Sequence, residues 1–431
     1  MTPAKCFAEM KDSGIHWMGR IPNNWKLIRA KFHFTQTNNR GNETPILLAA
    51  SQKYGVCPQS WLEGVVQVSE NTDLQQFKTV HKNDFVISLR SFQGGFERSD
   101  FEGVCSPAYQ VFHADNSFDN NFLKYLFKNE LFIDEMNSLT VGIREGRNIK
   151  YEDFANSLIF VPPLDEQTAI AAYLDTQCAK IDEIIAQAKA SIEDYKQWKA
   201  SIIYEAVTKG LNPNVEMKDS GIEWIPLLPT AIKVSRVGLH FSIILGKMLC
   251  PKPLDDTYTL EPYFCAANVH FSGVDSENLK EMWFNPDEKE RYRVAPGDLL
   301  VVEGGAGAGG CAVIETVDFP IYIQNSIMIV RSKRKNNVKY LKYFLETLVG
   351  RGYIDFACNK ATIPHFTKEK LSAVPFPVFD CDTQARIVDF LDSKCGKIDD
   401  LIFQKQSLID DLESYKKSLI CEVVTGKRRV V

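Results

Sequence analysis

Residues 166–208 read EQTAIAAYLDTQCAKIDEIIAQAKASIEDYKQWKASIIYEAVT, and residues 383–425 read TQARIVDFLDSKCGKIDDLIFQKQSLIDDLESYKKSLICEVVT. The two stretches align without a gap at an offset of 217 residues, and 18 of the 43 aligned pairs are identical. Identity at this level over so long a stretch marks an internal repeat. The sequence therefore predicts a tandem duplication, in which each unit ends in a long helical segment.

Apolar residues recur in both stretches at alternating steps of four and three, which is typical of helices that pair as a coiled coil. The predicted core positions are Leu174, Ile181, Ile185, Ile192, Ile202, Leu391, Ile398, Ile402, Ile409 and Leu419. Lys199 and Lys416 occupy the same position of this seam in the two copies. A lysine there either extends its ammonium group to water or controls the register of the pair.

Each helix has residues at its ends that favour a start and a stop. The prolines at 162–163 forbid helix before Asp165, which we expect to be the N-cap, and Gly210 stands where a left-handed C-terminal cap belongs. Asp382 and Gly426 are expected to do the same in the second copy. Because two like units in one chain usually relate by a pseudo-two-fold axis, we predict that the two helices pair antiparallel.

The duplication also covers the start of each unit, where MKDSGI at 10–15 recurs at 217–222. Between these motifs and the helices lie short apolar runs, broken by Gly, Pro, Asn and Asp, that predict strands. We expect strands at 65–68, 84–89 and 298–302 and helices at 120–135 and 338–348. The predicted fold class is α+β, with two mostly-β domains joined by two long antiparallel coiled-coil helices in a tandem pseudo-two-fold repeat. The expected boundaries are 1–160 and 213–378 for the domains, and 161–212 and 379–431 for the helices.

Composition narrows the function classes. The chain has 431 residues, 45% hydrophobic and 24% charged, as in ordinary globular proteins of more than one domain. We expect no signal peptide and no membrane span, because apolar runs of the needed length are missing. The net charge of −5 argues against a uniformly basic nucleic-acid coat. The 11 cysteines form no Cys-x-x-Cys and the 7 histidines no His-x-x-x-His, so we expect reduced thiols and no metal site.

Catalytic signatures are missing from the sequence. It has no P-loop, no His-Glu-x-x-His and no Asn-Pro-Pro-Tyr-like tetrapeptide. The glycine-rich run at 304–310 follows a predicted strand, but 311–314 predicts another strand and not a helix, so a hairpin is favoured over a dinucleotide site. Basic residues gather at 142–150, 331–335 and 427–429, where they form either a solvated face or phosphate contacts. The sequence therefore predicts a recognition protein that catalyses no reaction itself.

The motifs resemble those of the specificity (S) subunit of type I restriction–modification systems, the HsdS family. They are MKDSGI at 10–15, SLRSFQGGFE at 88–97, GVCSPAYQVF at 103–112, GIREGRNIKYEDF at 142–154 and VPPLDEQ at 161–167. The resemblance implies two target-recognition domains, each reading one half of a split double-stranded DNA target in the cytoplasm. It also implies host defence as the role, and helices that space the domains and dock two methyltransferase (M) subunits. Two restriction (R) subunits complete the enzyme, and S-adenosylmethionine, ATP and Mg²⁺ are expected on the partners and not on this non-catalytic chain.

Residue chemistry selects candidate DNA contacts, since arginine favours guanine and glutamine favours adenine in the major groove. In the first domain we expect base contacts from Arg90, Ser91, Gln93, Arg98 and Tyr109, close backbone approach at Gly94 and Gly95, and phosphate contacts from Arg144, Arg147 and Lys150. In the second domain we expect Gly305, Gly307, Gln324, Asn325 and Ser326 near the DNA, with Arg351 and Lys360 on phosphates. The alternatives are a coiled-coil DNA-binding scaffold or regulator outside a restriction system, an enzyme hidden in the globular parts, and a scaffold that binds only proteins.

Overall fold

A computed structural model describes residues 9–41, 46–62, 73–88, 95–139, 149–358 and 364–430. The chain divides into two compact units, residues 1–189 with 406–431, and residues 190–405. Both divisions fall inside the long helices, so each unit holds one globular part, the beginning of one long helix and the end of the other. The strand expected at 65–68 lies outside the described residues.

The first globular part contains two four-stranded sheets. One sheet is antiparallel and has the order β4 (Phe34–Thr37), β11 (Gln110–Ala114), β8 (Phe85–Ile87), β9 (Phe96–Arg98). The other has the order β6 (Gly55–Pro58), β5 (Leu47–Ser51), β10 (Gly103–Cys105), β7 (Lys78–Val80), with β5 and β10 parallel. Two further pairs are β1 (Met10–Asp12) with β2 (Arg20–Pro22) and β3 (Lys26–Arg29) with β12 (Leu158–Val161).

The helices of this part are short and capped. They are α1 (Asn120–Leu126), α2 (Glu130–Ser138) and α3 (Tyr151–Asn156), with 3-10 turns at Ala30–Phe32, Gln59–Trp61 and Leu74–Gln76. The single helix expected at 120–135 is thus two helices, because Asn129 caps a new one by accepting a hydrogen bond from Leu131 N at 3.1 Å. The core between sheet and helices is a cluster of buried phenylalanines, namely Phe85, Phe96, Phe112, Phe127 and Phe154.

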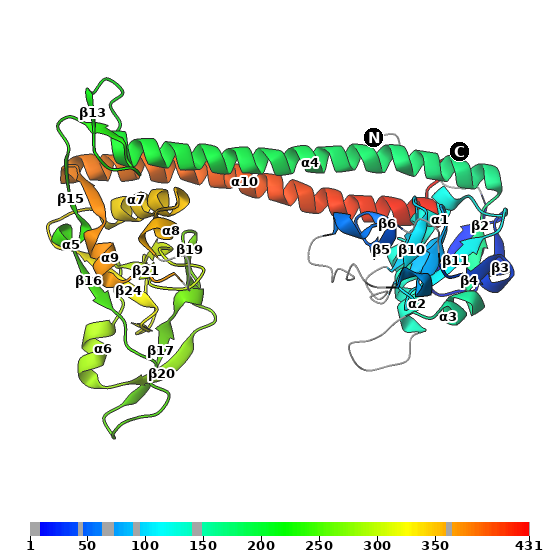
Figure 1. Ribbon diagram of the computed structural model, residues 1–431, viewed down its shortest axis with the longest axis horizontal. Coiled ribbons are helices and arrows are strands. Elements are labelled where there is room, and N and C mark those ends of the chain that lie inside the picture. Colours follow the sequence, from blue (N-terminus) through cyan, green and yellow to red (C-terminus); the bar gives the residue numbers. More distant parts are fainter. Residues whose placement is uncertain are drawn as a thin grey trace. The chain divides into compact units, whose positions relative to one another are not determined.

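The second globular part repeats the four-stranded antiparallel sheet but has three strands in its other sheet. Its antiparallel sheet has the order β16 (Phe241–Leu245), β24 (Ile327–Ser332), β21 (Leu299–Val302), β22 (Cys311–Val313). The second sheet has the order β20 (Lys280–Phe284), β17 (Thr259–Phe264), β23 (Tyr322–Ile323). The remaining pairs are β13 (Met217–Asp219) with β14 (Leu227–Pro229), β15 (Lys233–Arg236) with β25 (Pro375–Val378), and β18 (Val269–His270) with β19 (Gly273–Val274). The helices are α5 (Val237–His240), α6 (Pro286–Tyr292), α7 (Val338–Gly350), α8 (Tyr353–Ala357) and α9 (Lys368–Ala373). Figure 1 shows the strands of this part beside α7 and α9.

The two long helices are α4 (Leu164–Lys209, 46 residues) and α10 (Cys381–Val424, 44 residues). Gly210 and Gly426 adopt the left-handed conformation that ends them, as expected. The expected N-cap at Asp382 is wrong. Residue 381 is already helical, and Asp380 is the cap, because its carboxylate accepts from Thr383 N at 2.9 Å. Asp165 likewise lies inside the first turn of α4.

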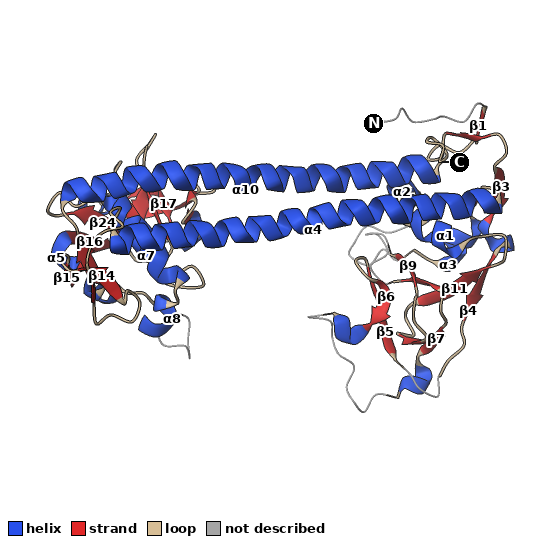
Figure 2. Cartoon of the chain, turned by 90° about the horizontal axis from the view of Figure 1, so that it is seen from above, coloured by secondary structure: helices blue, strands red, loops and turns tan. Residues whose placement is uncertain are grey.

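Within each unit the two helix halves lie side by side (Figure 2). Because each unit pairs the beginning of one helix with the end of the other, the pairing is antiparallel. Eight of the ten expected seam residues are buried, whereas Ile202 and Ile402 are half-buried and Ile203 lies deeper than Ile202. The α+β class with a tandem repeat and two long antiparallel helices is confirmed.

Candidate nucleic-acid interface

In the second globular part, several loops gather where β16 and β21 end and where β22 and β24 begin. Lys247 N donates to Ile323 O at 3.1 Å, and Asn325 N donates to Lys247 O at 2.8 Å. Glu303 N donates to Ser326 O at 2.8 Å. We call residues 303–310, 324–326 and 364–366, together with Lys247, the loop cluster. It brings together the five expected residues Gly305, Gly307, Gln324, Asn325 and Ser326. The expected hairpin over 303–310 is confirmed, because β21 and β22 are antiparallel neighbours.

Side-chain hydrogen bonds make the turn at 324–326 rigid. Gln324 Oε1 accepts from the Ser326 hydroxyl at 2.5 Å and from Ser326 N at 3.1 Å, while Gln324 Nε2 donates to Asn325 Oδ1 at 2.5 Å. Ser326 Oγ also accepts from Ala266 N at 3.0 Å, which ties the turn to the neighbouring sheet. A turn fixed in this way can present the same polar groups to a ligand without first being ordered.

Two cluster residues escaped the sequence analysis. His365 Nδ1 lies 3.2 Å from Glu303 Oε2, although the residues are 62 positions apart. The backbone joins the same segments, since Gly305 N donates to Pro364 O at 3.1 Å and Phe366 N to Glu303 O at 2.6 Å. The only local signal was the place of Glu303, directly before the glycine run; nothing near His365 in the sequence marks it.

Lys247, the third cluster residue that the sequence did not indicate, joins the cluster to the neighbouring sheet and helix α6. Its ammonium group donates to Glu288 Oε2 at 2.5 Å and to Trp283 O at 2.8 Å, and the side chain is only 9% exposed. The ammonium also lies 4.8 Å from the ring centre of Tyr258. A lysine with these partners holds the loop in place and is not available to a phosphate.

In the first globular part, Arg90, Ser91, Gln93, Gly94, Arg144 and Arg147 lie outside the described residues, as does Lys360 in the second. Three of the described candidates, Gly95, Tyr109 and Lys150, lie at the same end of the antiparallel sheet. Gly95 is buried immediately before β9, and its carbonyl accepts from Ser88 N at 3.0 Å. Tyr109 immediately precedes β11, and its carbonyl accepts from Lys78 Nζ at 2.7 Å. The Gln110 side chain donates to Ile149 O at 2.9 Å and accepts from Tyr151 N at 2.7 Å, which holds the backbone of the exposed Lys150 against the start of β11.

Two expected contacts are not brought to these loops. The Arg98 guanidinium donates to Asn121 Oδ1 at 2.5 Å and to Asp100 Oδ1 at 2.6 Å, at the opposite end of β9 from Gly95. Those partners occupy it, and its side chain is 13% exposed. The exposed Arg351 lies 4.4 Å from the ring centre of Tyr204 on α4, so it faces the helix and not the loop cluster.

A repeated clamp fixes each globular part on the beginning of its own long helix. The Tyr125 hydroxyl donates to Asp175 Oδ1 at 2.6 Å, and the Tyr343 hydroxyl donates to Asp392 Oδ1 at 2.6 Å. Burial, together with the neighbouring carboxylate, raises the pKa of both tyrosines well above the ordinary value, so both stay protonated donors. The buried amides of Gln167 and Gln384 add a second matching contact, accepting from Asp119 N and Asn337 N, each at 2.8 Å.

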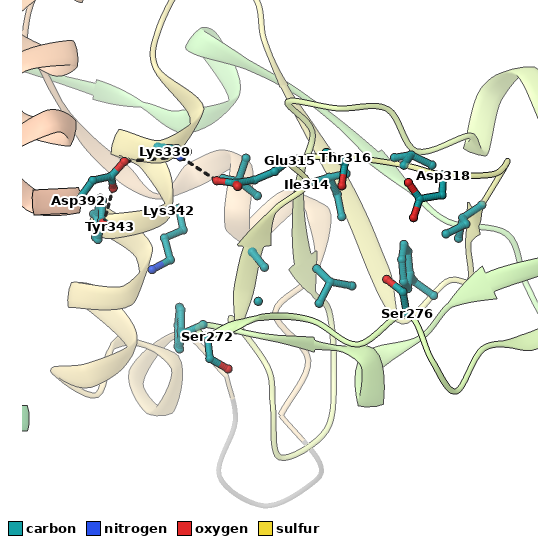
Figure 3. A pocket seen from close by; sticks show the side chains of 18 of the residues that line it. Ser272, Ser276, Ile314, Glu315, Thr316, Asp318, Lys339, Lys342, Tyr343 and Asp392 are labelled. Carbon is teal, nitrogen blue, oxygen red and sulfur yellow. Dashed lines mark hydrogen bonds and ion pairs between the residues drawn. The ribbon is translucent and has the colours of Figure 1, made fainter. Parts of the chain in front are cut away.

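A hollow of about 520 Å³ lies beside α7 in the second unit. Figure 3 shows side chains that line it. Three of its charged groups contact one another, because Lys339 lies 2.9 Å from Glu315 and 3.5 Å from Asp392. Lys342, which also lines it, lies 2.7 Å from Glu346 of the same helix. The pair of Lys339 with Asp392 joins α7 to α10 at one edge of the hollow.

The part of the chain that the structure describes offers little else for chemistry. It contains no group of three or more His, Cys, Asp or Glu side chains placed to hold a metal ion. The ten cysteines in it are all free. None of its helices combines the length and apolar character needed to cross a membrane.

Together these features define a duplicated α+β protein, in which each repeat carries polar residues at one end of a sheet and docks on a long paired helix. The chain belongs to the type I restriction modification DNA specificity domain family, whose model matches residues 26–194 and 273–409.

Relatives of known structure share the fold over most of the chain. A chain from a type I R-M system, solved in work on its complex assembly and conformational transition, is 18% identical with a TM-score of 0.71, covering 94% of this chain and 98% of that one. The HsdS subunit of Thermoanaerobacter tengcongensis is 17% identical with a TM-score of 0.53 and the same coverage. The EcoKI specificity subunit of Escherichia coli K12 is 26% identical over 203 residues, which are 46% of this chain and 39% of that protein. The match thus spans about two fifths of that curated relative.

Proposed function

We propose that this chain is the DNA-recognition subunit of a type I restriction–modification complex, and that each globular part reads one half of a bipartite DNA target. The observation that carries the proposal is the repetition of one arrangement. In both globular parts, polar residues lie where the first strand of the antiparallel sheet ends, namely Tyr109 and Lys150 in one and Gln324–Ser326 in the other. Family membership supplies DNA as the ligand.

The partners follow from the same proposal. Two methyltransferase subunits would dock on the paired helices and methylate adenine N6, and two restriction subunits would complete the enzyme. S-adenosylmethionine, ATP and Mg²⁺ would be bound by those subunits, and this chain would have no catalytic role. The complex would act in the cytoplasm, where it meets DNA.

Methylation mapping tests the recognition role. We would co-express the chain with the methyltransferase subunits of its system and detect modified adenines by long-read sequencing. A single bipartite motif with a fixed gap is expected. Methylation without a sequence motif would contradict the proposal, and methylation by the purified chain alone would show that it is an enzyme.

A domain exchange tests whether each globular part reads its own half of the DNA target. Replacing residues 19–160 with the corresponding part of a relative should change one half of the motif and leave the other half unchanged. If both halves change together, the two parts are not independent readers.

Native mass spectrometry tests the stoichiometry. Because the duplicated helices offer two similar sites, we expect two methyltransferase subunits on each chain. A dominant one-to-one complex at saturating methyltransferase would contradict this arrangement.

A further inference from the structure

The glycine-rich hairpin of the loop cluster carries a single hydrogen-bonding side chain, and it is a carboxylate. Residues 303–310 read EGGAGAGG, with Glu303 directly after β21. Glycine and alanine let the backbone approach a ligand closely but offer no polar side chain. Any discrimination between bases by side-chain hydrogen bonds from this hairpin therefore depends on Glu303.

Stability does not explain this carboxylate. The backbone already holds residues 364–366 against the hairpin, through Gly305 N to Pro364 O at 3.1 Å and Phe366 N to Glu303 O at 2.6 Å. The additional contact joins the Glu303 side chain, which is 17% exposed, to the His365 side chain, which is 59% exposed. Because the histidine is open to water, this contact adds little to the hold that the backbone hydrogen bonds already provide.

The chemistry of a carboxylate restricts what it can contact on DNA. An ionised carboxylate only accepts hydrogen bonds, and it is repelled by phosphates. His365 lies against Oε2, whereas Oε1 of Glu303 has no hydrogen-bond partner among the described residues. In the major groove, the donors on base edges are the amino groups N4 of cytosine and N6 of adenine. Carboxylates suit cytosine N4, because adenine is read better by amides that contact N6 and N7 together.

We propose that Glu303 reads the N4 amino group of a cytosine in the half-site of the second globular part, with His365 holding the carboxylate in position. This inference rests on the proposed function. The nearby amides of Gln324 and Asn325 cannot easily replace Glu303, since they are bonded to each other and to Ser326.

The test compares methylation motifs from complexes that carry the original chain, Glu303→Gln or Glu303→Ala, over a DNA library with randomised half-sites. The original chain should require cytosine at one position of the second half-site. Glu303→Gln should shift that position toward adenine and change the cytosine-to-adenine ratio by about tenfold or more. Glu303→Ala should relax the same position and leave the others unchanged.

Glu315→Gln is the matched control, because Glu315 is an exposed carboxylate of the same globular part that pairs with Lys339 instead. Its motif should equal that of the original chain. Unchanged preferences in both Glu303 variants would overturn the inference, as would loss of methylation at every sequence by variants that still assemble. The absence of any motif for the original complex would instead contradict the proposed function.

Discussion

Glu97 is a carboxyl group buried in the first globular part, on β9 between Phe96 and Arg98, with 2% of its surface exposed. Burial raises its pKa from the ordinary 4.5 to about 7, although the ammonium group of Lys128 contacts it and opposes the shift. The folded protein therefore holds this proton at a pH where the unfolded chain has released it. It follows that the contribution of Glu97 to stability falls as the pH rises from about 4.5 to about 7.

Glu97→Gln removes this pH dependence, because an amide does not ionise. At pH 8 the variant should gain stability relative to the original chain, on the order of 1–3 kcal/mol, and the gain should vanish at pH 4.5. Thermal unfolding at pH 4.5, 6 and 8 measures it. Glu102→Gln, at an exposed position, should follow the original chain at each pH. Equal pH profiles for Glu97→Gln and the original chain would contradict the raised pKa.

Lys150 is exposed, and its neighbours Ile149 and Tyr151 are hydrogen-bonded to the Gln110 side chain; we expect Lys150 to contact a phosphate there. Lys150→Ala should weaken binding to all DNA sequences alike and reduce the salt slope of log K by about one. Titrations of the assembled complex at several salt concentrations, on matched and mismatched DNA, measure both effects. Lys26→Ala, at an exposed position on β3, serves as the control. A loss confined to one base pair would make Lys150 a base reader.

The choice of residues by type found part of the candidate site, but it could not show which other residues each side chain contacts. Gln324 and Gly305 lie together in the loop cluster, whereas Arg98 is occupied by Asp100 and by Asn121, 23 positions away. His365 is brought to Glu303 across 62 positions. Contacts between residues so far apart are made only by the tertiary fold, so no local pattern could have signalled them.

At the scale of elements, two matching ion pairs join the long helices. Lys416 Nζ lies 2.6 and 2.7 Å from the two oxygens of Asp182 in the first unit. Lys199 Nζ lies 2.7 Å from both oxygens of Asp399 in the second. The seam lysines thus neither extend freely to water nor sit unpaired: each contacts an aspartate next to the partner seam. Such pairs favour one register of a coiled coil.

Charge reversal tests these pairs. Asp182→Lys should lower the free energy of unfolding by about 1 kcal/mol, because it places two ammonium groups together at a partly exposed site. Adding Lys416→Asp should recover most of that loss, and urea denaturation measures both changes. Glu193→Lys is the control, because Glu193 is exposed and its ion pair is with Lys196 of the same helix. A double variant no more stable than Asp182→Lys would show that the pair is not coupled.

The long helices were predictable because their signals are local. A seam of 3.5-residue spacing and a terminal glycine can both be read within one stretch of sequence, although neither expected N-cap, Asp165 nor Asp382, was right. Sheet order was not predictable in the same way, since β11 lies between β4 and β8 through pairings that span much of the domain. The break between α1 and α2 escaped notice because Asn129 caps a helix inside an otherwise continuous helical pattern.

At the scale of the whole molecule, the duplication gives each unit the same set of parts: a globular part, a tyrosine–aspartate clamp and one half of each long helix. The loop sequences differ between the two units more than the clamp residues and the long helices do. The second hairpin is built from glycine and alanine after a carboxylate, whereas the motif at 88–97 of the first carries arginine and glutamine. Because the two globular parts carry different loops on equivalent helices, we expect them to recognise two different half-sites of an asymmetric DNA target.

If the helices set the distance between the half-sites, lengthening them should lengthen the unread gap. One heptad inserted after Lys189 and another after Lys405 keeps the seam in phase and leaves both lysine–aspartate pairs inside their own units. The helix pair gains about 10 Å at 1.5 Å per residue. Because base pairs stack about 3.4 Å apart, the preferred gap should grow by about three pairs.

Three added base pairs also rotate one half-site by roughly 100°, since a turn takes about 10.5 pairs, so activity should fall even if the gap shifts as expected. The measurement is therefore the spacing of the remaining methylated sites over a library with randomised gaps. Inserting four residues in place of seven at both points is the control, because it moves the seam out of phase and should lower the unfolding temperature. An unchanged gap, in a heptad variant that folds and binds its methyltransferase, would mean that the helix pair does not set the distance.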